Sequence, residues 1–141
     1  MDEELGTVLG RALSHPLSGT NFSELGARYE GKVRDSYVTG KGRRLIVTTD
    51  RISAFDHVLG TLPLKGQLLT AMAAFWFEHT RDVAPNHLLG IPDPNVMECI
   101  ECQLLPVEMV VRAYVTGVTS TSIWTHYAQG KREFCGHKLP D

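Results

Sequence analysis

The chain has 141 residues, of which 43% are hydrophobic and 21% charged, and its formal net charge is −2. These values are typical of a globular protein that can bury a core, and a nearly balanced charge gives no reason to expect nucleic-acid binding. No apolar run approaches the roughly 18 residues of a membrane span, and the acidic start lacks the hydrophobic core of a signal peptide. We therefore expect a soluble cytoplasmic protein with neither nucleic-acid nor membrane partners.

The first half of the chain predicts one short helix followed mostly by strands. The predicted elements are an amphipathic helix over residues 5–13, a loop over 14–23, and extended segments over 28–39, 44–48 and 56–62. A bend is expected at Gly31, and residues 40–42 (Gly-Lys-Gly) predict a turn.

Residues 66–79 give the clearest helical pattern, with Leu68, Met72, Phe75 and Trp76 at spacings of three and four. The remaining positions are also mostly apolar, which predicts a helix buried on all sides. Aromatic side chains in such a helix favour a structural core over a cofactor site.

The second half predicts two strands, over residues 96–103 and 107–115, separated at Pro106, which cannot donate a ladder hydrogen bond. A helix is expected over residues 122–128, and residues 130–141 predict a loop with a hairpin. Together the elements predict an α+β fold with a mostly antiparallel sheet.

Cys99, Cys102 and Cys135 are too few and odd in number for a disulfide framework. Cys99 and Cys102, with Cys135 and His137, could complete a zinc site, which would make the chain a zinc-stapled structural or interaction domain. Residues three apart in a strand point to opposite faces, however, so ordinary unligated cysteines are the favoured interpretation.

Three groups of polar residues could carry chemistry. In the first, Gly31-Lys32-Val33-Arg34-Asp35, a glycine would let the backbone approach a phosphate, and Lys32 and Arg34 would supply positive charge from one face of a strand. A solvated strand face is the alternative. Neither of the standard phosphate-loop patterns, G-x-x-x-x-G-K-[ST] and G-x-G-x-x-G, occurs in the chain.

The second group runs from Asp50 to Asp56, includes Ser53, and is followed by Lys65-Gly66. Two carboxylates beside a serine could bind an amine or order a substrate. Because aspartate and serine also fix turns through backbone hydrogen bonds, a purely structural turn is an equal alternative.

The third group is Arg112, within an apolar strand-like run, followed by the hydroxyl-rich residues 116–122. Free N–H groups at a helix start favour an anion, and Thr119 or Ser120 is expected as the N-cap. The alternative is a simple cap beside a surface arginine.

Four segments in this order resemble the SAICAR synthetase family: residues 31–37 (GKVRDSY), 49–56 (TDRISAFD), 64–66 (LKG) before the helix with Phe75-Trp76-Phe77, and 108–117 (EMVVRAYVTG). The resemblance runs from about Phe22 to the end. It implies an ATP-dependent, Mg²⁺-requiring ligase that joins L-aspartate to carboxyaminoimidazole ribotide (CAIR). It also implies a two-lobed fold, loosely like that of protein kinases, with ATP in the cleft.

The resemblance also assigns roles to individual positions. The residues implied for ATP are Gly31, Lys32, Val33, Arg34, Asp35, Lys65, Gln103, Leu105 and Glu108. The residues implied for the other substrates are Ser53, Asp56, Arg112, Thr116, Gly117 and Ser120. The implied organisation is an N-terminal helix and loop (1–21), a nucleotide-binding lobe (22–105) and the beginning of a second lobe (106–141).

The chain departs from the family pattern at individual positions and in length. Val118 stands where the family usually has a serine, so Ser120 or a neighbouring hydroxyl would have to replace it, and Ala113 stands where a glycine is usual. Family members are also much longer, and the Mg²⁺ ligands are expected in the part that is missing here. We therefore expect an incomplete and nearly inactive fragment. A nucleotide-binding module without turnover and a homo-oligomer both remain compatible with the sequence.

Overall fold

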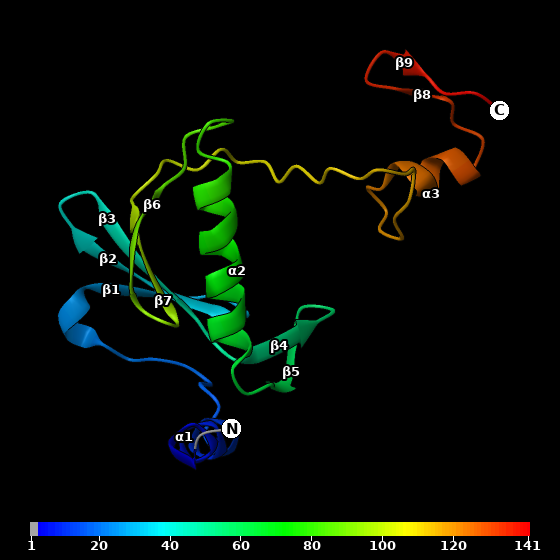
Figure 1. The fold of residues 1–141 in the computed structure, drawn as a ribbon. Coiled ribbons are helices and arrows are strands. Elements are labelled where there is room, and N and C mark those ends of the chain that lie inside the picture. Colours follow the sequence, from blue (N-terminus) through cyan, green and yellow to red (C-terminus); the bar gives the residue numbers. More distant parts are fainter. Residues whose placement is uncertain (1–2) are drawn as a thin grey trace. The chain divides into compact units, whose positions relative to one another are not determined.

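The computed structural model describes residues 3–141, which form two compact units, one ending at Gln103 and the other comprising Leu104–Asp141. The first unit contains an antiparallel sheet, a β-hairpin and two α-helices, and the second contains a short helix and a small hairpin (Figure 1). The predicted α+β class with a mostly antiparallel sheet is confirmed. No helix in residues 3–141 is both long and apolar enough to cross a membrane.

The main sheet has five antiparallel strands in the order β1-β2-β3-β7-β6 (Figure 1). Their bounds are β1 Ala27–Glu30, β2 Arg34–Gly40, β3 Arg43–Thr48, β6 Leu88–Asp93 and β7 Val96–Ile100. The predicted strand over residues 28–39 is divided into β1 and β2, because the Gly31 amide donates to the Arg34 carbonyl at 2.8 Å and closes a turn. Strand β6 was not predicted; it contains Pro92, which an edge strand tolerates.

The core of this unit combines apolar and polar side chains. Tyr37, Val47, Met97 and Cys99 are its buried apolar residues. The buried polar residues are Asp35, Thr48, Thr49, Asp50, Arg51 and Thr70. Buried polar groups need hydrogen-bond partners to avoid a large desolvation cost, and most of these lie on or beside β3 and β4.

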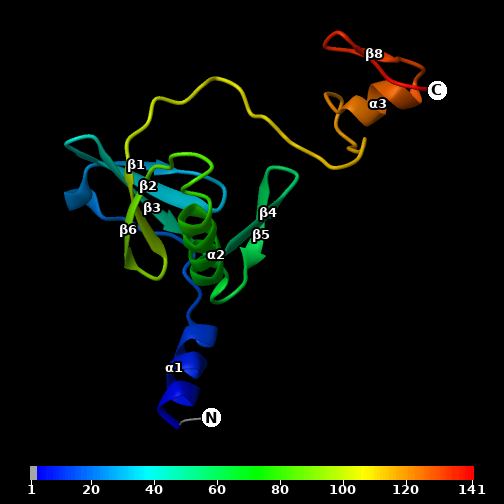
Figure 2. The same cartoon turned by 45° about the horizontal axis from the view of Figure 1, so that its top comes forward.

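The remaining elements of the first unit lie before and between the sheet strands. They are α1 (Glu3–Ser14), a 3₁₀ turn (Ser23–Leu25), the hairpin of β4 (Arg51–Ala54) and β5 (His57–Thr61), and α2 (Lys65–His79) (Figure 2). Strand β4 was not predicted as a strand. The hairpin reverses at Phe55 and Asp56, whose φ angles of 50° and 66° are both left-handed.

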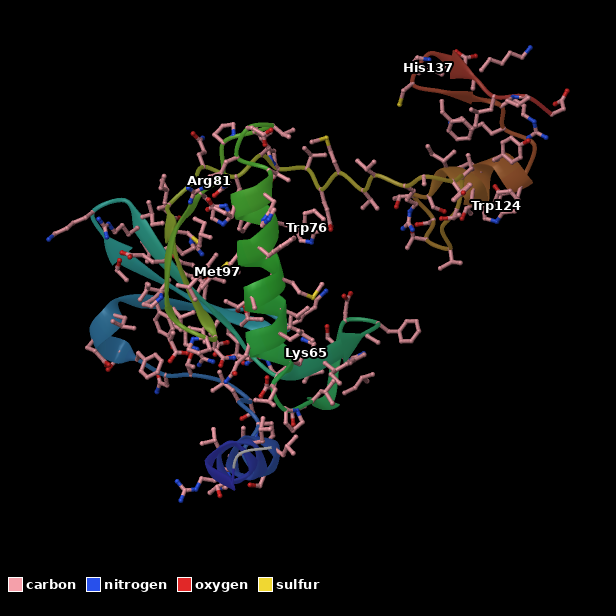
Figure 3. The ribbon with its side chains drawn as sticks, in the orientation of Figure 1. Lys65, Trp76, Arg81, Met97, Trp124 and His137 are labelled. Atoms are coloured by element: carbon pink, nitrogen blue, oxygen red, sulfur yellow. The ribbon has the colours of Figure 1, made fainter. Side chains whose placement is uncertain are left out.

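Helix α2 forms where the sequence predicts it, but the expectation that it is buried on all sides is wrong for this chain. It packs against β3 and β6, and its buried residues are Gly66 and Thr70. On its open side Leu68 is 62% exposed and Trp76 is 60% exposed, and Figure 3 shows Trp76 extending away from the helix. An apolar pattern around a helix predicts burial only if other elements are present to cover it.

In the second unit, α3 (Ile123–Ala128) is followed by the hairpin of β8 (Glu133–Phe134) and β9 (His137–Lys138). The Tyr127 hydroxyl donates to the Pro140 carbonyl at 2.9 Å and joins the helix to the end of the chain. The predicted strand over residues 107–115 is absent, because no strand of the described chain pairs with this segment.

Candidate functional site

Arg51 at the start of β4 holds the β1–β2 loop from inside the protein. Its side chain is only 6% exposed. Its guanidinium donates to the carbonyls of Ser18 at 2.7 Å, Gly31 at 2.9 Å and Lys32 at 3.0 Å. A planar guanidinium has five donors in a fixed arrangement, so one side chain can fix several carbonyls at once. The loop that begins at Gly31 is therefore shaped by a residue 20 positions away.

The carboxylate of Asp35 is the anion that accompanies Arg51. One oxygen accepts from Arg51 at 2.9 Å, and the other accepts from the Thr20 amide at 2.7 Å, the Thr20 hydroxyl at 2.9 Å and Arg28 at 3.3 Å. Burial acts to raise the pKa of this carboxyl, but the hydrogen bonds from Arg51 and Thr20 outweigh it and the pKa is lowered. Because Asp35 is fully buried and fully bonded, its placement favours support of the loop over direct contact with a ligand.

Lys32 and Asp56 are brought together at the surface, from the β1–β2 loop and the tip of the β4–β5 hairpin. Their side chains form an exposed ion pair. The hydrogen bond and charge of Lys32 lower the pKa of the Asp56 carboxyl. Lys32 lies in the turn and not in a strand, so the expectation that strand alternation places it on one face with Arg34 is wrong.

The beginning of α2 is fixed to the same region by Asp50, Lys65 and Gly66. Asp50 accepts from the Gly66 amide at 2.8 Å, and Lys65 donates to the Arg51 carbonyl at 3.0 Å. A Cβ at Gly66 would lie 2.2 Å from the Thr48 carbonyl oxygen and 2.4 Å from Nδ2 of Asn95, so only glycine fits there. The ammonium of Lys65 is thus already bonded to the backbone beside the loop.

Arg34 lines a small hollow of about 300 Å³ with Gly31 and side chains of β1–β3. Arg44 also lines the hollow; it donates to Ser36 at 2.9 Å and is paired with Glu101. Of the two arginines, it is the Arg34 side chain that makes no hydrogen bond or ion pair within residues 3–141, so its guanidinium is available to an anion.

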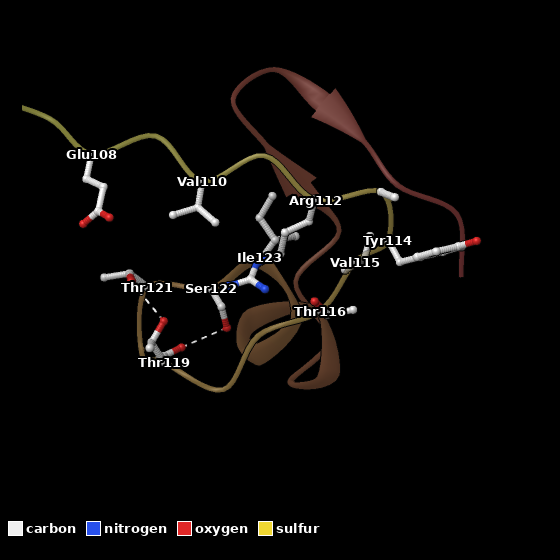
Figure 4. Close-up of a pocket in the computed structure, with 11 residues that line it drawn as sticks. Glu108, Val110, Arg112, Tyr114, Val115, Thr116, Thr119, Thr121, Ser122 and Ile123 are labelled. Atoms are coloured by element: carbon white, nitrogen blue, oxygen red, sulfur yellow. Dashed lines mark hydrogen bonds between the residues drawn. The ribbon is translucent and has the colours of Figure 1, made fainter. Parts of the chain in front are cut away.

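Within the second unit, a cavity of about 560 Å³ is lined by Arg112 and Thr116, and Glu108 also lines it (Figure 4). Arg112 has no hydrogen bond or ion pair with any residue of the described range. Ser120 and Gly117 do not line this cavity. Gly117 has φ +120°, and a Cβ there would lie 2.6 Å from Cβ of Ser122, so this glycine is required by the backbone.

The hydroxyls before α3 are largely used by the helix itself. Ser122, and not the expected Thr119 or Ser120, is the N-cap, and it accepts from the Thr125 amide at 3.4 Å. The hydroxyls of Ser122 and Thr125 both donate to the Thr119 carbonyl at 2.9 Å. Ser120 makes no such bond among the described residues and its hydroxyl is available.

The other predicted positions lie in less constrained surroundings. Ser53 is on β4, opposite Val58 of β5. Gln103 and Leu105 follow β7 in exposed chain without regular structure. The structure therefore gathers residues 31–35, 50, 51, 56, 65 and 66 into one constellation and groups Glu108, Arg112 and Thr116 in another.

The cysteines have no arrangement typical of a metal site within either unit. No group of three or more His, Cys, Asp or Glu side chains in the described residues is arranged to hold a metal ion. Cys99 is fully buried in β7, and burial, helped by the charges of Cys102 and Glu98, raises the pKa of its thiol to about 11. Zinc binds the thiolate, so this environment opposes ligation, and the zinc-stapled alternative has no support.

The sequence pattern offered Asp50 as a carboxylate for an amine and gave Arg51 no role, whereas both are buried and Asp50 accepts from the amides of Leu17 and Gly66. Their burial could have been predicted from their position directly after the β-branched strand of residues 44–48, because residues next to a core strand are often buried with it. Thr20 carried no signal, because its contact with Asp35 joins a loop to a strand 15 residues away.

The sequence matches the SAICAR synthetase family over residues 27–139. A putative phosphoribosylaminoimidazole-succinocarboxamide synthase 2 of Mesorhizobium japonicum is 52% identical over 125 residues, which cover 89% of this chain and 40% of that protein. The phosphoribosylaminoimidazole-succinocarboxamide synthase of Legionella pneumophila (strain Lens) is 51% identical over 116 residues, covering 82% and 37%. The chain thus spans roughly two fifths of the length of these relatives.

Solved structures lead to the same family. The SAICAR synthase of Saccharomyces cerevisiae, complexed with SAICAR, superposes with a TM-score of 0.75 at 30% identity, over 89% of this chain and 48% of that chain. A type-2 SAICAR synthetase in complex with ADP has a TM-score of 0.61 at 21% identity, over 82% and 47%, and shows the shared fold alone. The resemblance seen in the sequence is therefore confirmed, and the chain belongs to the SAICAR synthetase family.

Proposed function

We propose that this chain supplies the nucleotide-binding lobe and the beginning of the second lobe of an ATP-dependent ligase of purine biosynthesis. The reaction joins L-aspartate to CAIR and gives SAICAR, ADP and phosphate. The observation that carries the proposal is the family match over residues 27–139, together with relatives that are named as this synthase. None of those names supports a nucleotide-binding module without turnover.

The first constellation is our candidate for the ATP site. We propose that the loop from Gly31 to Val33 lies over the phosphates with Lys32 and Arg34 as their cations, and that Asp35 and Lys65 support it. The family resemblance implies Gln103, Leu105 and Glu108 as further nucleotide positions, and this assignment rests on the resemblance alone. The open guanidinium of Arg34 and the exposed Lys32 support this assignment, since phosphate recognition requires accessible donors.

The second constellation is our candidate for the ribotide. Arg112 and Thr116 line one cavity, and the free guanidinium of Arg112 suits a phosphate or carboxylate. Gly117 would shape the backbone, and Ser120 would supply the hydroxyl that Val118 lacks. We propose that Ser53 and Asp56 face the substrate side of the β4–β5 hairpin.

The proposed chemistry has two steps. A carboxylate oxygen of CAIR attacks the γ-phosphorus of ATP, and the bond to the bridging oxygen breaks to release ADP. The amine of aspartate then attacks the acyl carbon, phosphate leaves, and the amine loses a proton. Cationic residues of the chain would assist by positioning the phosphates and neutralising charge. The described residues contain no cluster suited to Mg²⁺, so no step is assigned to the metal here.

We propose that the isolated chain binds its substrates with little or no turnover. Its cytoplasmic location stays a prediction. The test combines two measurements: calorimetric titration with MgATP and with CAIR, and ADP release with CAIR, aspartate and MgATP, omitting each in turn. The full-length Legionella relative is the matched control. We expect the chain to bind MgATP and CAIR. We expect only the full-length relative to release ADP, and only when all three substrates are present. Binding of neither MgATP nor CAIR would overturn the proposed function, and turnover comparable to the relative would overturn the proposed incompleteness.

A further inference from the structure

The backbone of the β1–β2 loop is bonded on one side only. The carbonyls of Gly31 and Lys32 accept from Arg51 at 2.9 and 3.0 Å. The next carbonyl, that of Val33, accepts from the Thr49 hydroxyl at 2.8 Å and the Thr49 amide at 3.1 Å. Three consecutive carbonyls are thus directed inward, toward Thr49 and Arg51.

Peptide geometry determines where the amides of the same loop point. The chain has no cis peptide bond in its described part, and in a trans peptide the N–H points opposite to the C=O of the same plane. Since the Gly31 and Lys32 carbonyls face Arg51, the amides of Lys32 and Val33 face away from it. Neither amide donates to another group within residues 3–141. They are two adjacent free donors in the same loop.

We propose that Arg51 is a positioning residue for phosphate binding: it holds the loop carbonyls inward, so that the amides of Lys32 and Val33 are presented together to an anionic oxygen of the nucleotide. This rests on the proposed ATP site. Successive backbone amides directed to one side form an anion-binding concavity, and amides held in place need no reorganisation when the ligand arrives.

Arg51 is suited to this task in a way that lysine is not. Its guanidinium serves carbonyls of two loop residues, the Ser18 carbonyl and the Asp35 carboxylate at the same time. The Asp35 carboxylate balances its charge within the core, so the positive charge itself is not offered to the ligand. The effect on phosphate therefore passes through the backbone, which distinguishes Arg51 from Lys32 and Arg34.

The test is Arg51→Lys, which keeps the charge opposite Asp35 but cannot fix both loop carbonyls. The matched control is Arg28→Lys, because Arg28 contacts Asp35 at 3.3 Å and Glu30 at 3.1 Å without bonding to a loop carbonyl. Nuclear magnetic resonance titrations of the wild-type chain and both variants with ATP and with adenosine would give dissociation constants and amide shifts. Circular dichroism would verify the fold of each variant.

We expect Arg51→Lys to weaken ATP about tenfold or more, since each hydrogen bond to a charged oxygen contributes an effect of that order. Adenosine affinity is expected to stay unchanged, and Arg28→Lys to bind ATP like the wild type. In the wild-type chain, ATP should shift the amide resonances of Lys32 and Val33. Two results would overturn the positioning role and leave the proposed ATP site standing. One is ATP binding to the wild-type chain without those amide shifts, and the other is a folded Arg51→Lys variant that binds ATP with unchanged affinity.

Two other outcomes are also decisive. If Arg51→Lys does not fold, the wild-type amide shifts of Lys32 and Val33 decide the question alone. If the wild-type chain binds neither ATP nor adenosine, both the positioning role and the proposed nucleotide site are wrong.

Discussion

Replacement of Asp35 by asparagine tests the buried ion pair that supports the candidate ATP loop. Asp35 is fully buried, and its two oxygens accept from Arg51, Arg28 and both donors of Thr20. Asparagine has almost the same shape but replaces one acceptor oxygen by an NH₂ donor. If the NH₂ takes the position of Oδ2, it faces the Thr20 amide; if it takes the position of Oδ1, it faces the Arg51 guanidinium. Either orientation places donor against donor and leaves the buried Arg51 charge uncompensated.

The expected cost of Asp35→Asn is about 3–5 kcal/mol of unfolding free energy, the range for breaking a buried ion pair by removing one partner. The matched control is Asp56→Asn, which removes the other carboxylate paired with this loop. Asp56 and Lys32 are both exposed, so this change is expected to alter stability little. Urea denaturation would measure both, in a Trp124→Phe background that leaves Trp76 of α2 as the only tryptophan reporter.

The difference between wild type and Asp35→Asn should also depend on pH in a defined direction. The folded-state pKa of Asp35 is lowered, so the unfolded chain takes up the proton first as the pH falls. The stabilisation is therefore complete above the unfolded pKa of about 3.9 and is lost as the pH falls through the folded value. We expect a large difference at pH 7 that narrows below about pH 4. A cost below about 1 kcal/mol at pH 7, or one that does not change with pH, would refute the ion-pair argument.

Three further changes test other parts of the first unit. Gly66→Ala would place a Cβ 2.2 Å from a β3 carbonyl oxygen and should lower the unfolding free energy by about 1–3 kcal/mol. In the control Gly90→Ala the new Cβ has nothing within 4 Å, so the loss should be at most about 1 kcal/mol. Equal urea midpoints for the two variants would contradict the clash. Phe55→Asn should raise the unfolding free energy by about 0.5–1 kcal/mol, because asparagine tolerates the left-handed φ of 50° in a tight hairpin turn; a lower midpoint would be contrary evidence. Iodoacetamide at about pH 8 should modify exposed Cys102 rapidly and buried Cys99 only after unfolding, and early labelling of Cys99 by mass spectrometry would show that its strand opens.

The sequence predicts the positions of the helices and most sheet strands well, because each has a local signal. The spacing of Leu68, Met72 and Trp76 gives α2, and the β-branched run before Thr49 gives β3. Strands β4 and β6 were missed for opposite reasons. Strand β4 is short and polar, so its residues are equally typical of a turn. In β6, Pro92 is a turn signal that an edge strand nevertheless accommodates.

The candidate site is less predictable, because its geometry depends on contacts between distant segments. The motif of residues 31–35 predicts a loop with positive charge, and Arg34 and Lys32 do remain accessible. That Asp35 is buried depends on Thr20 and Arg51, which lie 15 and 16 residues away. The sequence of residues 31–35 does not indicate which of its polar side chains forms hydrogen bonds inside the protein. A structural or a ligand-binding role can therefore be assigned to each residue only after its partners are known.

The two predictions that failed most clearly share one physical cause. The apolar surface of α2 and the strand pattern of residues 107–115 both predict burial or pairing that this chain does not provide. Val111, at 95% exposed, would be costly to keep in water if nothing ever covered it. The relatives are more than twice the length of the matched segment, since it covers 40% and 37% of them. An apolar pattern therefore predicts that a surface needs a cover and does not identify the element that covers it.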